Sequence, residues 1–146
     1  MEAKELRIGN YIDVPGKNTV GAVVSVVHSL NNMSVYLGGL HVPDSIKGET
    51  VKYHECEGIP LTPEWLEWLG FPETLQTWND GSKATIFRKG KYFLERLLHD
   101  ETTFALARIN TTGGEFMANV NYIHQLQNLY FALTGEELNL NVELHE

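Results

Sequence analysis

The chain has little cysteine, no long apolar run and one segment without charge. Among its 146 residues there is a single cysteine, Cys56, which excludes an internal disulfide and favours a reducing compartment. No apolar stretch approaches the roughly 20 residues that a membrane-spanning helix needs. Residues 1–12, MEAKELRIGNYI, carry charges where a signal peptide has an apolar run. We therefore expect a soluble, cytoplasmic protein that does not enter a membrane.

The usual signatures of catalysis and cofactor binding are also missing. The sequence contains no GxSxG, GxGxxG, GxxxxGK[ST] or HExxH motif. We expect a strand over residues 50–56, TVKYHEC. In that strand His54 and Cys56 would share one face and could reach a zinc ion, but no second pair of ligands has a suitable spacing. We expect no catalytic residues, no metal and no cofactor, and a protein that is not an enzyme.

The charge balance is acidic, with a formal net charge of −8. General binding to DNA or RNA depends on neutralising phosphates, so this balance argues against it. Five of the eleven basic residues nevertheless lie between Lys83 and Arg96, interleaved with aromatic residues. Cations hold phosphates and aromatic rings stack on bases, so this segment is a candidate ligand- or anion-binding site. Basic residues also protect hairpins from edge-to-edge pairing, which is the simpler interpretation. The candidate residues are Lys83, Arg88, Lys89, Lys91, Tyr92 and Arg96.

Turn signals and residue alternation predict an α+β fold. Residues 15–18 and 31–32 separate short β-branched segments in the first half, and residues 79–81, 88–90 and 112–114 have hairpin-turn composition. We predict a small, SH3-like β-barrel or curled antiparallel sheet in the N-terminal half, followed by a second antiparallel sheet with a C-terminal helix. The segment KYFLERLL fits either a strand or a helical turn. The expected subdomains are 1–58, β-rich and SH3-like, and 59–146, which is α+β.

Two helices are expected in the second subdomain, near 63–69 and 121–134. Thr62 is suited to the N-cap of the first, and Pro63 to its first position, where a missing N–H costs nothing. The second ends at Gly135, because glycine is the residue that most readily adopts the left-handed conformation after a helix.

The second predicted helix lies in the uncharged segment. No Lys, Arg, Asp or Glu occurs between Glu115 and Glu136, although a helix in a small soluble domain normally presents charges to water. The polar side chains opposite its apolar stripe are neutral hydrogen-bonding groups, which an interface tolerates better than charges. A homo-oligomer, a docked partner or a ligand pocket would explain them, and so would packing within the chain with the amides bonded to backbone groups. The candidate interface residues are His124, Gln125, Gln127, Asn128 and Phe131.

Three segments carry a resemblance to a known family. KELRIGNYI (4–12), GIPLTPEWLEWLGF (58–71) and YIHQLQNLYFALTGEEL (122–138) resemble a family of small uncharacterised proteins of phages, prophages and mobile elements of Bacteroidetes. The resemblance implies one shared fold and an accessory role inside the host bacterial cell. It brings neither an assigned activity nor site residues.

These observations lead to three hypotheses about function. The first is a non-enzymatic accessory protein that binds a host protein, a defence component being one candidate, because catalytic signatures are missing and one helix face is uncharged. The second is a small-ligand binder that sequesters a nucleotide signal through the basic segment. The third is a nucleic-acid accessory factor that uses the N-terminal barrel, and its binding would fall steeply with salt.

Overall fold

A computed structural model describes residues 5–14, 24–30, 34–38, 50–111 and 113–139. The chain forms two compact units, which we call the N-terminal unit (1–59 with 122–135) and the sheet unit (60–121 with 136–146). Each is a mixture of strands and a helix, so the α+β class is confirmed. The division differs from the predicted boundary between 58 and 59, because the C-terminal helix belongs to the unit that contains the first strands.

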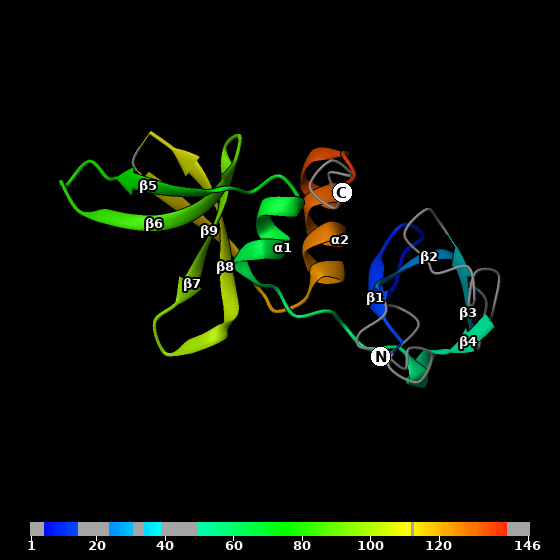
Figure 1. Cartoon of the computed structure of the whole chain (residues 1–146). Helices are drawn as coiled ribbons and strands as arrows, with labels where there is room; N and C mark the ends of the chain where they lie inside the picture. The colour runs from blue at the N-terminus through cyan, green and yellow to red at the C-terminus, as the bar shows by residue number, and fades with distance from the viewer. Residues whose placement is uncertain (1–4, 15–23, 31–33, 39–49, 112, 140–146) are drawn as a thin grey trace. The chain divides into compact units, whose positions relative to one another are not determined.

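Four antiparallel strands in the order β1-β2-β3-β4 make up the sheet of the N-terminal unit (Figure 1). After β4 the chain turns through a short 3-10 helix, Tyr53–Glu55, and returns to β1. Asp13 and Glu57 each donate a backbone N–H to the other's carbonyl oxygen at 2.9 Å. The predicted turns at 15–18 and 31–32 lie outside the described residues. The strands are β1 (Tyr11–Asp13), β2 (Val24–Leu30), β3 (Ser34–Gly38) and β4 (Thr50–Lys52).

The 3-10 helix corrects one prediction from the sequence. Residues 50–56 alternate like a strand, but β4 ends at Lys52, and the N–H of Cys56 donates to the carbonyl of Tyr53 at 3.1 Å. His54 and Cys56 therefore do not occupy alternate positions of one strand. His54 is exposed and Cys56 is buried, so the two side chains have different environments.

Within the N-terminal unit, a glutamine of helix α2 (Ile123–Thr134) bonds the helix to the start of β1. The side-chain oxygen of Gln127 accepts the backbone N–H of Tyr11 at 2.8 Å, and its amide nitrogen donates to the carbonyl of Gly9 at 3.0 Å. The amide thus pairs with the backbone at the start of β1 much as a neighbouring strand would. Gln127 is fully buried, so its bond to Tyr11 is shielded from water, and its bond to the half-buried Gly9 is partly shielded.

Asn128 continues this attachment one residue further along α2. Its amide nitrogen donates to the carbonyl of Glu5 at 3.0 Å, and its oxygen accepts from the Asn10 side chain at 2.8 Å and from Arg7 Nε at 3.2 Å. The Arg7 guanidinium lies 4.3 Å from the centre of the Phe131 ring, within the range of a cation–π contact. The neutral side of α2 is thereby bonded to the segment before β1.

His124 lies in the first turn of the same helix and is almost fully buried, at 1% exposure. Its ring stacks on Tyr122 with centroids 5.8 Å apart, and Nε2 is 3.9 Å from a carboxylate oxygen of Glu5. Burial lowers the pKa of the imidazole below 6.5, because desolvation disfavours the charged form more than the Glu5 carboxylate favours it. His124 is therefore held in its neutral form.

The sheet unit begins with helix α1 (Pro63–Trp68), close to the predicted range 63–69. Thr62 caps it, since its hydroxyl accepts the N–H of Trp65 at 3.2 Å. Gly70 follows the helix with a φ of 92°, a left-handed conformation that suits glycine. Leu66, buried within α1, and Phe71, just after it, contribute to the core.

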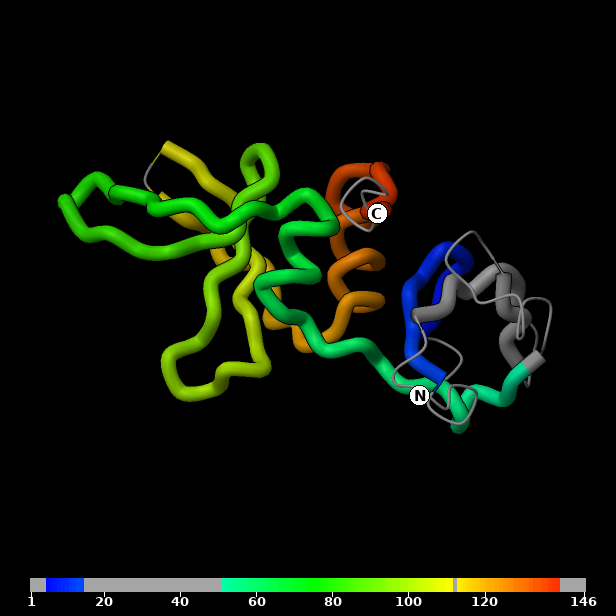
Figure 2. The backbone as a smooth tube through the Cα atoms, in the orientation of Figure 1, coloured from blue at the N-terminus to red at the C-terminus, as the bar shows by residue number. Residues whose placement is uncertain are grey.

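Five antiparallel strands in the order β5-β6-β7-β8-β9 follow, and this sheet is open rather than closed into a barrel. β6 and β7 share only three register pairs, so the β5–β6 and β7–β8 hairpins diverge (Figure 2). KYFLERLL contains a strand and not a helical turn. Among the described residues, no helix is long and apolar enough to cross a membrane. The strands are β5 (Glu73–Thr77), β6 (Lys83–Lys89), β7 (Tyr92–Leu97), β8 (Asp100–Asn110) and β9 (Gly113–Val120).

Alternation along β8 distinguishes the two faces of this sheet. Phe104 and Leu106 are fully buried on one face, which we call the covered face. Phe87, on the same face, contacts the Phe104 ring edge-to-face at 5.9 Å, and α1 packs against β6. Ala105 and Ala107 point to the other face, which we call the open face. The larger side chains therefore form the core and the smaller ones leave space.

Removing the Gln127 amide tests its part in attaching α2. Gln127→Ala leaves the Tyr11 N–H and the Gly9 carbonyl unpaired in a buried place, which we expect to cost about 1–3 kcal/mol of unfolding free energy. Urea unfolding followed by circular dichroism measures this cost, and hydrogen exchange at the Tyr11 amide localises it. The control is Gln76→Ala, which removes exposed amide bonds. Equal effects of the two substitutions would contradict the attachment.

The buried neutral histidine makes stability depend on pH. The pKa of His124 is lower in the folded chain than the ordinary 6.5, so the unfolded chain takes up a proton first as the pH falls. Stability from this group is therefore present above pH 6.5 and lost below it. His124→Phe should lose less stability than the parent between about pH 7.5 and about pH 5.5 in thermal unfolding, whereas exposed His54→Phe should behave like the parent. Parallel profiles for parent and His124→Phe would show that His124 does not titrate in this way.

Candidate functional site

The open face of the sheet carries a small apolar cluster that α1 does not cover. Ile86, Phe93 and Ala107 are buried there, and the half-buried Trp78 packs against them with Ala84 and Ile109. The Trp78 and Phe93 rings are 5.5 Å apart between centroids and tilted by 49°. These residues form a shallow second core, whose outer surface is the best-defined candidate site in the described part of the chain.

A hollow of about 290 Å³ lies on this face over β7, β8 and β9. Ala105, Ala107 and Gly114 form its floor, and the aromatic side chains of Trp78, Phe93 and Phe116 stand around it. Among the described residues, Glu95 is the one charged side chain that lines it. The pairing explains this arrangement, because Phe93 lies opposite Ala107 and Ala107 lies opposite Phe116 on neighbouring strands.

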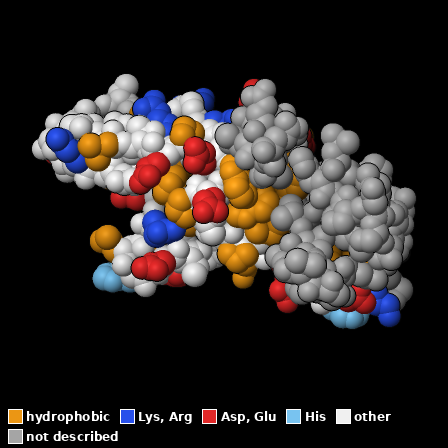
Figure 3. Space-filling model, viewed as in Figure 1, with side chains coloured by type: hydrophobic (Ala, Val, Ile, Leu, Met, Phe, Trp, Pro, Cys, Tyr) orange, Lys and Arg blue, Asp and Glu red, His pale blue; other side chains and the backbone are white. Residues whose placement is uncertain are grey.

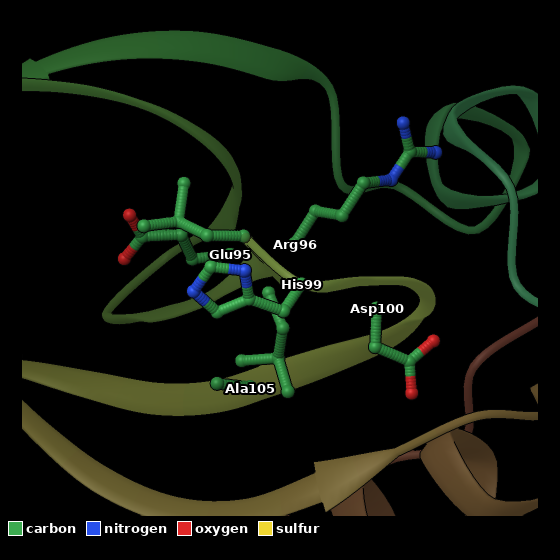
Figure 4. A pocket seen from close by; sticks show the side chains of 7 residues that line it. Glu95, Arg96, His99, Asp100 and Ala105 are labelled. Atoms are coloured by element: carbon green, nitrogen blue, oxygen red, sulfur yellow. The ribbon is translucent and has the colours of Figure 1, made fainter.

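A second hollow, of about 390 Å³, continues toward the β7–β8 turn and shares Glu95 and Ala105 with the first. In Figure 4, Glu95 and His99 lie on the same side of the hairpin, while Arg96 extends away from them. Asp100 is used within the turn, where its carboxylate accepts the N–H and hydroxyl of Thr102 and the hydroxyl of Thr103. These hydrogen bonds lower the pKa of Asp100, which keeps the carboxylate charged.

Large apolar side chains at the rim are exposed to solvent. Phe116, on β9, is 62% exposed, and Leu98, at the tip of the β7–β8 hairpin, is 94% exposed. Phe116 lines the first hollow and Leu98 lines the second. On the face viewed in Figure 3, acidic and basic side chains of the sheet unit are interspersed with apolar ones and form no continuous basic stripe. An exposed apolar surface rimmed by polar groups is typical of an interaction site.

The predicted anion-binding residues do not share one surface. Arg88 pairs with Phe93 and lies on the open face, whereas Lys89 pairs with Tyr92 and lies on the covered face. Arg96 lies on the covered face as well, with its guanidinium 5.3 Å from the centre of the Phe104 ring. Strand alternation thus sends neighbouring basic residues to opposite sides of the sheet.

The other predicted anion-binding residues either lie far apart along β6 or interact with residues next to them in the chain. Lys83 pairs with Thr77, at the other end of β6 from Lys89. Lys91 lies in the turn after β6, 5.8 Å from the centre of the Tyr92 ring. Arg88 donates to the carbonyl of Gly90 at 2.7 Å. The structure places Lys89 and Lys91 beside Tyr92, but it does not bring the whole set of predicted residues together.

The predicted interface residues of α2 have bonding partners inside the N-terminal unit. Gln127 and Asn128 bond to the segment before β1, and the Gln125 oxygen accepts the N–H of Tyr122 at 3.2 Å. Phe131 is partly exposed beneath Arg7, and His124 is buried. For Gln127 and Asn128, these bonds correspond to the alternative in which α2 packs within its own chain. The helix therefore presents less free surface than its sequence indicates.

The Cys56 region does not form a metal site with its described neighbours. Burial raises the pKa of the Cys56 thiol to about 11, so it stays protonated at neutral pH. Within residues 5–14, 24–30, 34–38, 50–111 and 113–139, no three His, Cys, Asp or Glu side chains come together as metal ligands.

Neither the hollow nor its walls were predicted from the sequence. The available signal was the segment FALARI, in which large residues alternate with alanines, followed by a pair of glycines. This pattern indicates one filled and one hollowed face, but Trp78 and Phe116 are placed there by strand register. Comparisons with protein-family models, with curated proteins and with solved structures give no match to this chain.

A methyl group at Gly114 should narrow the hollow. A Cβ there would lie 2.9 Å from Cζ of Phe93, so the ring must move. We expect Gly114→Ala to cost about 1–3 kcal/mol of unfolding free energy through overpacking. The cost should be smaller in a Phe93→Leu background, because the shorter side chain removes the clash. Urea unfolding of the four chains in this double-mutant cycle measures the coupling, and additive costs would contradict the contact.

Proposed function

We propose that this chain is a non-enzymatic binding protein that docks a partner protein on the open face of its sheet unit. The observation that carries the proposal is an aromatic-walled hollow with the exposed Phe116 at its rim, beside a second hollow that is lined by the exposed Leu98. Aromatic residues in well-packed pockets contribute much of the affinity at protein interfaces. The small floor residues leave room for a side chain of the partner.

The kind of partner follows from the family resemblance of residues 4–12, 58–71 and 122–138. It favours an accessory protein of a phage or mobile element, acting on a protein of the bacterial host, with a defence component as one candidate. This origin, the cytoplasmic location and the identity of the partner belong to the proposal. A homo-oligomer is an alternative occupant of the same face.

Nucleotide sequestration is the alternative function, and the placement of the basic residues gives it less support. A phosphate site needs several cations directed at one place. Arg88 and Lys89 lie on opposite faces of the sheet, and Arg96 is directed at Phe104 on the covered face. A role as a nucleic-acid accessory factor that uses the N-terminal unit is a third candidate, and the net charge of −8 argues against it.

We also propose that the N-terminal unit is a curled, SH3-like sheet. Its support is the antiparallel order of four strands, the 3-10 helix at Tyr53–Glu55 and the backbone bridge between Asp13 and Glu57. The bridge brings the chain after β4 back to β1, which is the step that a barrel needs to close.

Photocrosslinking from the open face tests the binding function. A benzoylphenylalanine at position 116 should crosslink a host protein in a Bacteroidetes lysate, and the same group at position 75 should not. Leu75 is 65% exposed and lies on the opposite face by register, so it matches Phe116 in exposure but not in place.

The captured protein is then purified and its affinity for the chain is measured. Phe116→Ser should weaken binding by about tenfold or more if this residue is a hot spot. Leu75→Ser should leave the affinity within about twofold, as expected for a residue outside the interface. Equal crosslinking at both positions, or equal affinity of both variants, counts against docking on the open face.

A further inference from the structure

The walls of the hollow on the open face suit one type of side chain. Phe93 and Phe116 occupy register positions on either side of Ala107. The Phe93 ring reaches across β8, since its Cζ would lie 2.9 Å from a Cβ on Gly114, and it covers Ala107, which is buried. The space left for a side chain is therefore over Ala105, between this ring, Phe116 and Glu95. Trp78 adds a third ring beside Phe93. Aromatic faces are negative, so they attract a cation as well as an apolar stem.

The charge at the rim of the hollow also favours a side chain with a positive charge. Glu95 lines both hollows, and the described residues make neither a hydrogen bond nor an ion pair with its carboxylate. The basic side chains nearby are engaged elsewhere. Arg88 donates to Gly90 and to the Gln76 side chain, and Arg96 is directed at Phe104 on the other face. An exposed carboxylate beside aromatic rings is complementary to a positive charge, in a chain whose net charge is −8.

We infer that the hollow receives a Lys or Arg side chain from a basic, partly apolar segment of the partner protein. The inference rests on the proposed function and specifies its chemistry. The aliphatic stem of the side chain lies on Ala105, its charged group meets the aromatic rings and Glu95, and neighbouring apolar residues of the segment cover Phe116 and Leu98. Arginine suits the site best, because its planar guanidinium stacks on aromatic rings.

Small probes of the side chain test this on the full chain. The probes are n-butylguanidinium and n-butylammonium, with n-butanol as the neutral analogue and butyrate as the anionic one. The readout is the indole N–H resonance of Trp78 in nitrogen-15 spectra, identified by its loss in Trp78→Phe. Both cations should shift it in a saturable way, and added salt should weaken the effect. The neutral and anionic analogues should shift it little.

Two variants separate the charge from the rings. Glu95→Gln should weaken binding of the cations by about two- to fivefold, as for an exposed ion pair. Phe116→Leu keeps apolar bulk but removes a ring, so it should weaken the cations by about two- to fivefold and leave n-butanol unchanged. The control is Glu101→Gln, an exposed acid that does not line either hollow.

The outcomes separate this inference from the proposed function. Equal shifts from n-butanol and the cations, unaffected by Glu95→Gln, overturn the cation site and leave docking of an apolar segment intact. A shift with butyrate alone also overturns it. No shift with any probe overturns it too, and the crosslinking from positions 116 and 75 then decides independently whether a protein docks on this face.

Discussion

The sheet unit depends on the alternation of large and small side chains along β8. Phe104 and Leu106 fill the face toward α1, and Ala105 and Ala107 lie between them on the other face. Because successive side chains of a strand point to opposite faces, one short sequence supplies a packed core and a hollow at once. The neighbouring strands then place Phe93 and Phe116 beside the alanines. Filling the Ala105 position would narrow the hollow without touching the covered face.

The N-terminal unit depends on a different constraint, the need to satisfy buried backbone groups. The Tyr11 N–H and the Gly9 carbonyl are met by the Gln127 amide, which has both a donor and an acceptor. A charged side chain could not take its place without the cost of burying an unpaired charge. The absence of charge on α2, a puzzle in the sequence, follows for Gln127 and Asn128 from these bonds.

Local features were the most predictable from sequence. Thr62, Pro63 and Gly70 delimit α1, and Gly135 has the left-handed conformation expected after α2. Caps and turns depend on residues close together in the chain, so short patterns suffice to predict them. The 3-10 helix after β4 was missed because apolar alternation continued past the point where the backbone changes direction.

The candidate site was much less predictable. Composition concentrated attention on the basic residues between Lys83 and Arg96, but alternation and pairing divide them between two faces. The membership of α2 in the N-terminal unit was also hidden, since it rests on bonds between residues more than a hundred positions apart, such as Gln127 and Tyr11. Composition gives the number of charges and amides, but not their neighbours.

By itself the sequence determined the α+β class, the positions of both helices and most hairpins of the second sheet, because these follow from periodicity, caps and turns. Only the tertiary structure decided which side chains share a surface. Strand register gathered Trp78, Phe93 and Phe116 around an alanine floor and left Glu95 at its rim. The physical reason is that register joins residues far apart in the chain, and a shift by one residue would send each side chain to the opposite face.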